Sequence, residues 1–303
     1  MQDVQQKAAA SALPSTNGHA SAAGKQIVRV EPPSGWQFVN WREVLAYRDL
    51  LWTQVHRGVT VAYKQTVMGF GWAIFGPVFS MVVFTVIFGN LAKVPSDGVP
   101  YALFSYTALL PWQYFAGALG GTTSSLVGNR GIFTKVYFPR LILPLVPLGT
   151  GLVGFGISFG VLICLMIWYA VVPTLWVLFL PVLIAILMLT ALGVGLWLSS
   201  LALQYRDVGR IVGYAKQLLM YAAPVVWPVS LLAEKFPENV ELIRILYGLY
   251  PMAGVIEGFR AAILGTVPMP WDLIGMGTIT AVVLTVTGAF YFRRTEHLFA
   301  DVA

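Results

Sequence analysis

Long apolar runs dominate the chain, and polar residues gather between them. A bilayer core of about 30 Å needs about 20 helical residues to cross it, and six runs reach that length. They fall near Phe70–Ala92, Tyr101–Val127, Leu141–Val171, Leu175–Leu203, Ile211–Leu232 and Trp271–Phe292. The pattern predicts an all-α polytopic membrane protein with six transmembrane helices.

A further helical segment precedes the first run. Within Trp41–Val59, apolar residues recur at three-to-four spacing opposite a charged face. This spacing is typical of an amphipathic helix that lies along a membrane interface. We therefore predict an N-terminal interface helix, and an ordinary packing helix is the alternative.

The last loop between runs, Glu234–Pro270, has helical periodicity of its own. It holds two stretches, Glu238–Leu249 and Ala253–Leu264, which are each too short to span a bilayer and are split by Tyr250-Pro251. We predict a pair of short re-entrant helices on the outer side.

Within that loop, acidic and basic residues are placed for local pairing. Glu257 and Arg260 lie three residues apart, as do Glu241 and Arg244. Residues at this spacing are neighbours on one helical face. Each pair is predicted to form a local ion pair.

Composition supports a membrane domain with little soluble mass. The 303 residues are 57% hydrophobic and 11% charged, with a mean hydropathy of +0.74, whereas soluble domains carry about 25% charged residues. The net charge of +6 raises the possibility of nucleic-acid binding. The basic residues flank the apolar runs instead, so they favour membrane orientation and no nucleic-acid partner.

The distribution of basic residues predicts the topology. With the N-terminus inside, 15 of the 19 Lys and Arg residues fall on the cytoplasmic side, Lys216 among them, and 4 fall outside. The positive-inside rule therefore favours cytoplasmic placement of both termini. The predicted parts are a disordered cytoplasmic tail (1–35), an interface-helix region (36–66), a six-span domain (67–294) and a C-terminal tail (295–303).

Catalytic and cofactor motifs are missing from the sequence. There is no phosphate-binding loop of the Gly-x-x-x-x-Gly-Lys-Ser/Thr type, and the three histidines and Cys164 do not form a metal-ligand spacing. We predict no enzyme activity and no cofactor in this chain. No acidic or basic residue lies in the middle of a predicted span, which disfavours an ion-coupled carrier and indicates an energy source outside the chain.

The cytoplasmic loops are short, basic and aromatic, as in Asn129–Arg140 (NRGIFTKVYFPR) and Gln204–Arg210 (QYRDVGR). Arginine and aromatic residues dominate the energetics of protein interfaces, so these loops suit docking to a partner. Anchoring at the membrane surface is the alternative. The candidate docking residues, taken with two from the interface helix, are Trp52, Arg57, Arg130, Phe133, Lys135, Tyr137 and Arg140.

Four segments together resemble a known family. They are YKQTVMGFGWAIFGPVF, SLVGNRGIFTKVYFPRLILPL, LQYRDV and YPMAGVIEGFRAAILG. In this order they are similar to the permease subunits of bacterial ABC exporters for polysaccharides, which handle O-antigen, capsule and teichoic acid. The resemblance runs from about Trp36 to Arg294. Tyr250 departs from it, because family members often have Asn before this proline.

The resemblance implies a setting for the chain. It implies a homodimer in the bacterial cytoplasmic (inner) membrane, bound to two copies of a separate ATPase that holds the ATP. It also implies surrounding membrane lipids and a lipid-linked glycan as substrate. The outer helix pair would then act as a gate, with Tyr250, Pro251, Glu257 and Arg260 as its candidate residues. An ABC permease of the same architecture for a drug or a simple lipid is the alternative.

A glycan substrate directs attention to aromatic residues inside the spans. The second run carries a cluster around Pro111 that an interfacial aromatic belt does not explain. Sugars stack on aromatic faces, so we predict that part of the cluster lines the substrate path, with simple helix packing as the alternative. The cluster consists of Tyr106, Trp112, Gln113, Tyr114 and Phe115.

Overall fold

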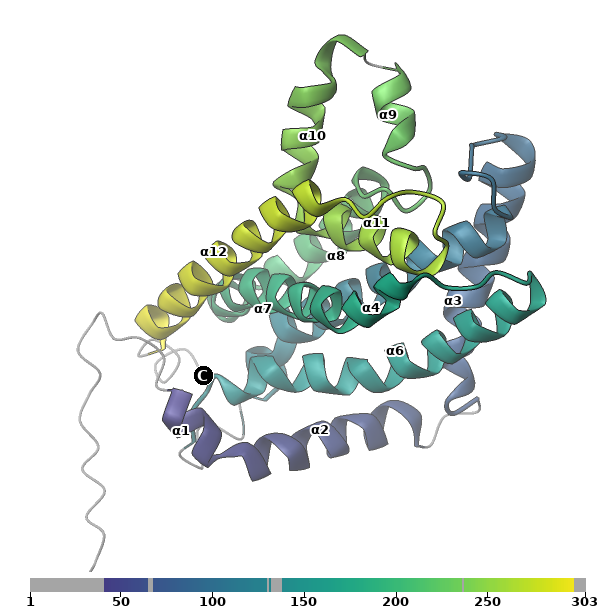
Figure 1. Ribbon diagram of the computed structural model, residues 1–303. Coiled ribbons are helices and arrows are strands. Elements are labelled where there is room, and N and C mark those ends of the chain that lie inside the picture. Colours follow the sequence, from purple (N-terminus) through teal and green to yellow (C-terminus); the bar gives the residue numbers. More distant parts are fainter. Residues whose placement is uncertain (1–40, 65–67, 130, 132–137, 236, 297–303) are drawn as a thin grey trace, which may run out of the picture. The chain divides into compact units, whose positions relative to one another are not determined.

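In the computed structural model, the described residues are 41–64, 68–129, 131, 138–235 and 237–296, and they form helices and turns without any strand (Figure 1). The predicted N-terminal tail lies outside these ranges, as do residues 297–303 of the predicted C-terminal tail. The helices are α1 (Trp41–Ala46), α2 (Arg48–Tyr63), α3 (Gly71–Phe84) with its π-helical extension η1 (Thr85–Leu91), α4 (Tyr101–Gly128), α6 (Ile142–Trp168), η2 (Leu175–Phe179), α7 (Leu180–Gln204), α8 (Val208–Ala222), α9 (Ser230–Lys235), η3 (Pro237–Asn239), α10 (Val240–Gly248), α11 (Pro251–Ile263) and α12 (Trp271–Thr295).

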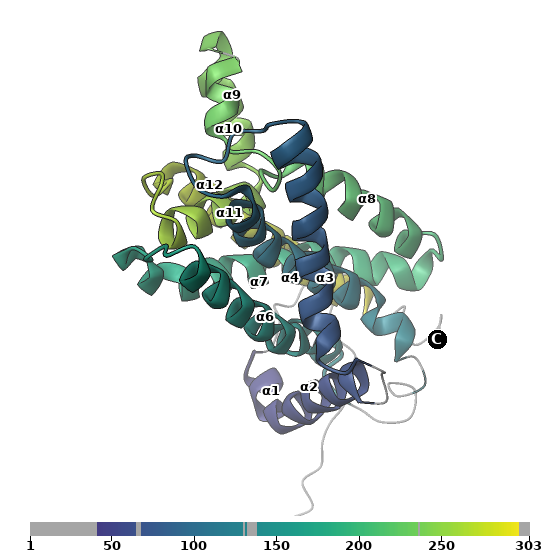
Figure 2. The same cartoon turned by 90° about the vertical axis from the view of Figure 1, so that its right-hand side faces the viewer.

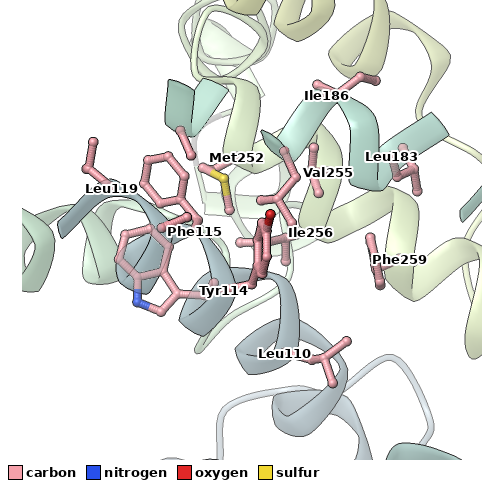
Figure 3. Packing of buried hydrophobic residues seen from close by; sticks show 14 of the residues in the cluster. Leu110, Tyr114, Phe115, Leu119, Leu183, Ile186, Met252, Val255, Ile256 and Phe259 are labelled. Carbon is pink, nitrogen blue, oxygen red and sulfur yellow. The ribbon is translucent and has the colours of Figure 1, made fainter. Parts of the chain in front are cut away.

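Helix α4 is the centre of the packing. It contacts α3, α6, α7, α8 and α11, and its side chains are buried on nearly every face from Tyr101 to Phe115. An all-round apolar helix is stable only when other helices cover it. Figure 3 shows part of this core, where Phe115 of α4 lies close to Met252 of α11.

Helices α7 and α12 approach each other more closely than side chains would normally permit. A Cβ atom added to Gly288 would lie 2.5 Å from the carbonyl oxygen of Gly193. Along the same contact, Thr285 donates a hydrogen bond to the Leu189 carbonyl at 2.9 Å, and the rings of Trp197 and Tyr291 stack at 4.3 Å. Small residues at the crossing allow this approach, as is common between membrane helices.

Among the described residues, four helices are long and apolar enough to cross a membrane. They are Gly71–Leu91, Ile142–Trp168, Leu175–Gln204 and Trp271–Thr295, and a fifth is possible if the bent pair α10 and α11 counts as one span. The all-helical membrane architecture is confirmed, whereas the predicted count of six spans is not.

The fifth predicted span, Ile211–Leu232, is wrong as a continuous helix. Helix α8 ends at Ala222, and turns follow as far as Val229. Pro224 and Pro228 lie in these turns. Proline lacks the backbone N–H that a helix interior needs, which explains the interruption.

The predicted interface helix, Trp41–Val59, is two helices that meet at Tyr47. Helix α2 packs along α6, with Val55 against Gly149 and Gly58 against Thr150. Trp52 belongs to the predicted apolar face but is 73% exposed. Packing on α6, which was the alternative, accounts for one side of α2, and a place at the membrane interface stays a prediction.

Candidate functional site

Helix α11 is enclosed by the rest of the chain. All thirteen of its residues are buried, and its axis is bent by 98° from that of α10. The bend occurs at Tyr250, whose extended backbone is typical of a residue before proline. The predicted break between two short helices is therefore confirmed, and Pro251 begins the second helix, as is common at this position.

A buried ion pair lies on α11. The Nη1 atom of Arg260 lies 2.8 Å from Oε1 of Glu257, and the two side chains are 1% and 7% exposed. The Arg260 guanidinium also lies 3.6 Å from the ring centroid of Phe104 on α4, in a cation–π arrangement. The predicted pairing of these residues is confirmed. Burial makes each charge costly without its partner.

The same ion pair holds the turns that follow α8. Arg260 Nη2 donates to the Val225 carbonyl at 2.9 Å, and the Val229 N–H donates to Glu257 at 3.4 Å. From α4, the Tyr101 hydroxyl donates to the Val226 carbonyl at 2.6 Å. Residues 223–229 are thus tied to α11, through Arg260 as a donor and Glu257 as an acceptor, and to α4 through the Tyr101 hydroxyl.

The second predicted ion pair on the outer loop differs from expectation. Arg244 pairs with Asp272 at the start of α12 and not with Glu241. Asp272 lies in the first turn of its helix, where a carboxylate is also favoured by the helix dipole. The structure therefore joins α10 to α12 where the sequence predicted a contact within α10.

The aromatic cluster of α4 separates into two groups. Tyr106, Trp112 and Phe115 are buried in the core, and the Tyr106 hydroxyl donates to the Ser158 carbonyl at 3.0 Å. Tyr114 is also largely buried and donates to the Leu148 carbonyl at 2.9 Å. Packing explains the first three residues without a ligand, and a path role for them stays a prediction.

Gln113 and Tyr114 line a cavity of about 430 Å³ between α2, α3, α4 and α6. Rings from Trp72 and Phe155 also line it. Within the described part of the chain, neither the Gln113 amide nor the Thr150 hydroxyl has a hydrogen-bond partner. Aromatic faces beside the unpaired Gln113 amide match the surface of a sugar, which is apolar on its faces and polar at its edges.

Helix α3 presents an aromatic stripe that the sequence analysis missed. Trp72, Phe75 and Phe79 are 53%, 47% and 57% exposed, and neighbouring ring centroids lie 5.8 and 5.6 Å apart. Their spacing of three and then four residues, which places them on one helical face, was a readable signal.

Helix α8 exposes a second stripe, which consists of Ile211, Tyr214, Leu218 and Tyr221. Figure 2 shows α3 at the front and α8 to its right, and both contact α4. On α4, the residues Gly117 and Ser124 are exposed. Together, the two stripes and this α4 surface form a candidate path.

Lys216 lies near the start of the predicted span Ile211–Leu232. The topology prediction placed it on the cytoplasmic side, and its ammonium donates to the carbonyl of Ala116 in the middle of α4 at 3.2 Å. Glu257 and Arg260 belong to the predicted outer loop, so the expectation that no charge lies in the middle of a span, and with it the case against an ion-coupled carrier, stays a prediction.

The candidate docking residues are only partly described. Trp52 and Arg57 are exposed on α2, whereas Arg130, Phe133, Lys135 and Tyr137 lie outside the described residues. Arg140 donates to the backbone carbonyl of Glu296, so it ties the segment before α6 to the end of α12. Glu296 also pairs with Arg293 at 2.7 Å.

Comparison with known proteins supplies a family. The sequence profile of the family described as "ABC-2 type transporter" matches residues 49–264. An "O-antigen export system permease protein RfbA" of Myxococcus xanthus is 27% identical over 256 residues, which cover 84% of this chain and 96% of that protein. A protein of the same name from Klebsiella pneumoniae is 28% identical over 255 residues, or 84% of this chain and 95% of that protein.

Proposed function

Because the chain belongs to the ABC-2 type transporter family, we propose that it is the permease subunit of an exporter of lipid-linked polysaccharide, with O-antigen as the first substrate to test. The observation that carries this proposal is the similarity to O-antigen export permeases along almost their whole length. As a transport subunit, the chain relies on a separate ATPase for energy, and it holds no cofactor of its own.

The exposed surfaces support a homodimer. Apolar and aromatic stripes are exposed on α3 and α8. Polar groups such as Gln217 are exposed beside the stripe of α8, and lipid tails satisfy polar groups poorly. A second copy facing the first would enclose the α4 surface between the stripes. The resulting passage would offer aromatic faces to a sugar chain while excluding lipid.

Energy coupling gives the decisive experiment. The purified permease is expected to hydrolyse no ATP, and to export glycan only when its ATPase partner is present. Two copies of the partner are expected to bind through the 129–140 loop and α2, so Arg130→Glu with Lys135→Glu should weaken the complex without unfolding the permease. The measurements are ATPase activity, co-purification and cell-surface glycan. ATP hydrolysis by the permease alone would refute the proposal.

The path is tested by comparing exposed and buried aromatic residues. Trp72→Ala and Phe79→Ala are expected to slow export per folded permease, because each removes an exposed stacking face. Trp112→Ala is expected to lower the amount of folded permease, because truncating a buried Trp costs roughly 3–5 kcal/mol. Membrane abundance and surface glycan, measured together, separate the effects. Unchanged export by both α3 variants would exclude a path along this stripe.

The proposed topology places both termini in the cytoplasm and α10 outside. In a Cys164→Ser background, Asn239→Cys is expected to react with an impermeant maleimide in intact cells, since Asn239 is exposed beside α10. Tyr205→Cys, which is 60% exposed in the native chain between α7 and α8, should react only after the cells are lysed. The opposite labelling pattern would reverse the orientation.

A further inference from the structure

Lys216 places a positive charge against the middle of α4. From Val208 to Lys216, the axis of α8 rises ~12 Å at ~1.5 Å per residue, and the ammonium contacts Ala116 near the middle of α4. A hydrocarbon core is about 30 Å thick. If α8 begins at the cytoplasmic surface, as proposed above, the charge lies near mid-membrane depth, where an unpaired cation is costly.

The Lys216 ammonium lies against one helical turn of α4. Its Nζ atom lies 2.8 Å from where a Cβ of Gly120 would be, one helical turn from Ala116. Gly120 therefore leaves the space that the ammonium occupies. This position keeps the charge against the exposed side of α4, where a ligand in the candidate path would pass.

Protein groups supply only part of what the ammonium needs. An ammonium has three donors, and the Ala116 carbonyl accepts one. In the described part of the chain, no carboxylate lies within ion-pair distance of Lys216. A countercharge must then come from water-exposed ions or from a ligand, and ionisable residues at this depth commonly mark a substrate pathway.

The neighbouring α4 surface indicates what kind of ligand would supply that charge. Gln113 and Gly117 line the 430 Å³ cavity, and each lies three residues before a residue that the ammonium contacts, Ala116 and Gly120 respectively. An open amide and aromatic rings suit a sugar, and the adjacent ammonium suits a phosphate oxygen. We propose that Lys216 is a binding residue for the phosphate of a sugar-phosphate substrate, with the cavity at Gln113 holding the adjoining sugar.

This proposal rests on the proposed function and deepens it. The phosphate has two possible sources, namely the linker between lipid and glycan, or a phosphate within the glycan itself. Both present the same anionic oxygens to the ammonium, and a ligand that lacks phosphate would gain nothing from the lysine. Charge at residue 216 should therefore govern affinity for phosphate-bearing ligands alone.

Binding to the permease–ATPase complex in phosphatidylcholine nanodiscs tests the proposal. The probes are undecaprenyl diphosphate for the linker, glucose 1-phosphate for the glycan, and undecaprenol as the uncharged comparison. Lys216→Gln and Lys216→Met are expected to weaken binding of at least one phosphate probe by about tenfold or more, the size of a lost charge-assisted hydrogen bond. Lys216→Arg should stay within about threefold of the native protein, since it keeps the charge.

Lys235→Gln is the matched control, because it removes an exposed positive charge at the end of α9, in the loop that is proposed to lie outside. Size-exclusion chromatography confirms that each variant is folded, and the two neutral variants guard against one failing to fold. The probe that responds identifies the source of the phosphate. Equal binding of both phosphate probes by native and neutral variants would overturn the proposal. Failure of the proposed function would look different, because Lys216-dependent binding would persist without glycan export.

Discussion

Arg260→Met is expected to lower the free energy of unfolding by roughly 3–5 kcal/mol, because it leaves Glu257 as a buried charge without its partner. Arg260 is the largest fully buried side chain among the described residues. It joins α11 to the Val225 carbonyl and to the Phe104 ring. The midpoint of thermal unfolding in detergent should fall by on the order of 10 °C.

Two further variants test the cause of that loss. Arg244→Met breaks the exposed pair with Asp272 and should cost no more than about 1 kcal/mol, because water screens it. Adding Glu257→Gln to Arg260→Met should recover part of the lost stability, since the stranded charge is removed. If the double variant is no more stable than Arg260→Met, then hydrogen bonds to residues 223–229, and not the uncompensated charge, explain the loss.

The sequence predicted the ion pair between Glu257 and Arg260 but not its importance. Spacing along a helix shows which side chains are neighbours, and that part is local. Whether the pair is buried depends on α4 and the turns after α8, which are distant in sequence. The helix break at Tyr250 shows the same division. Proline marked its position in the sequence, whereas the 98° angle between α10 and α11 is visible only in the structure.

The prediction for α8 failed for a physical reason. Hydropathy averaged over a window counts Lys216 and the two prolines as minor interruptions of an apolar run. The structure shows that proline ends the helix at Ala222 and that the lysine reaches the middle of α4. A hydropathy average contains no information about where a long side chain places its charge.

The candidate path shows a similar limit of what residue spacing can predict. The aromatic residues of α4 were predicted to line the path, since they lie at mid-span, yet neighbouring helices cover α4 on nearly every face from Tyr101 to Phe115. The exposed stripe at Trp72, Phe75 and Phe79 has an equally regular spacing. Spacing shows that residues share a face, whereas only the tertiary packing shows which face is covered.

The crossing of α7 and α12 is the second place where a single change should have a large effect. Gly288→Val is expected to lower the free energy of unfolding by roughly 3 kcal/mol, at the upper end of overpacking effects. The first added carbon would lie 2.5 Å from the Gly193 carbonyl oxygen and 3.1 Å from the Trp197 ring, so the helices must separate. Separation would also disturb the hydrogen bond from Thr285 to Leu189.

Gly275→Val provides the control on the same helix. A Cβ at Gly275 would have no atom within 4 Å, so this variant shares the loss of a glycine and the gain of a β-branched residue without the clash. Thermal unfolding in detergent and the yield of monodisperse permease should be close to native for Gly275→Val and clearly reduced for Gly288→Val. Similar unfolding midpoints for the two variants would show that α12 adjusts its position on α7, and that close packing at Gly193 does not fix their crossing.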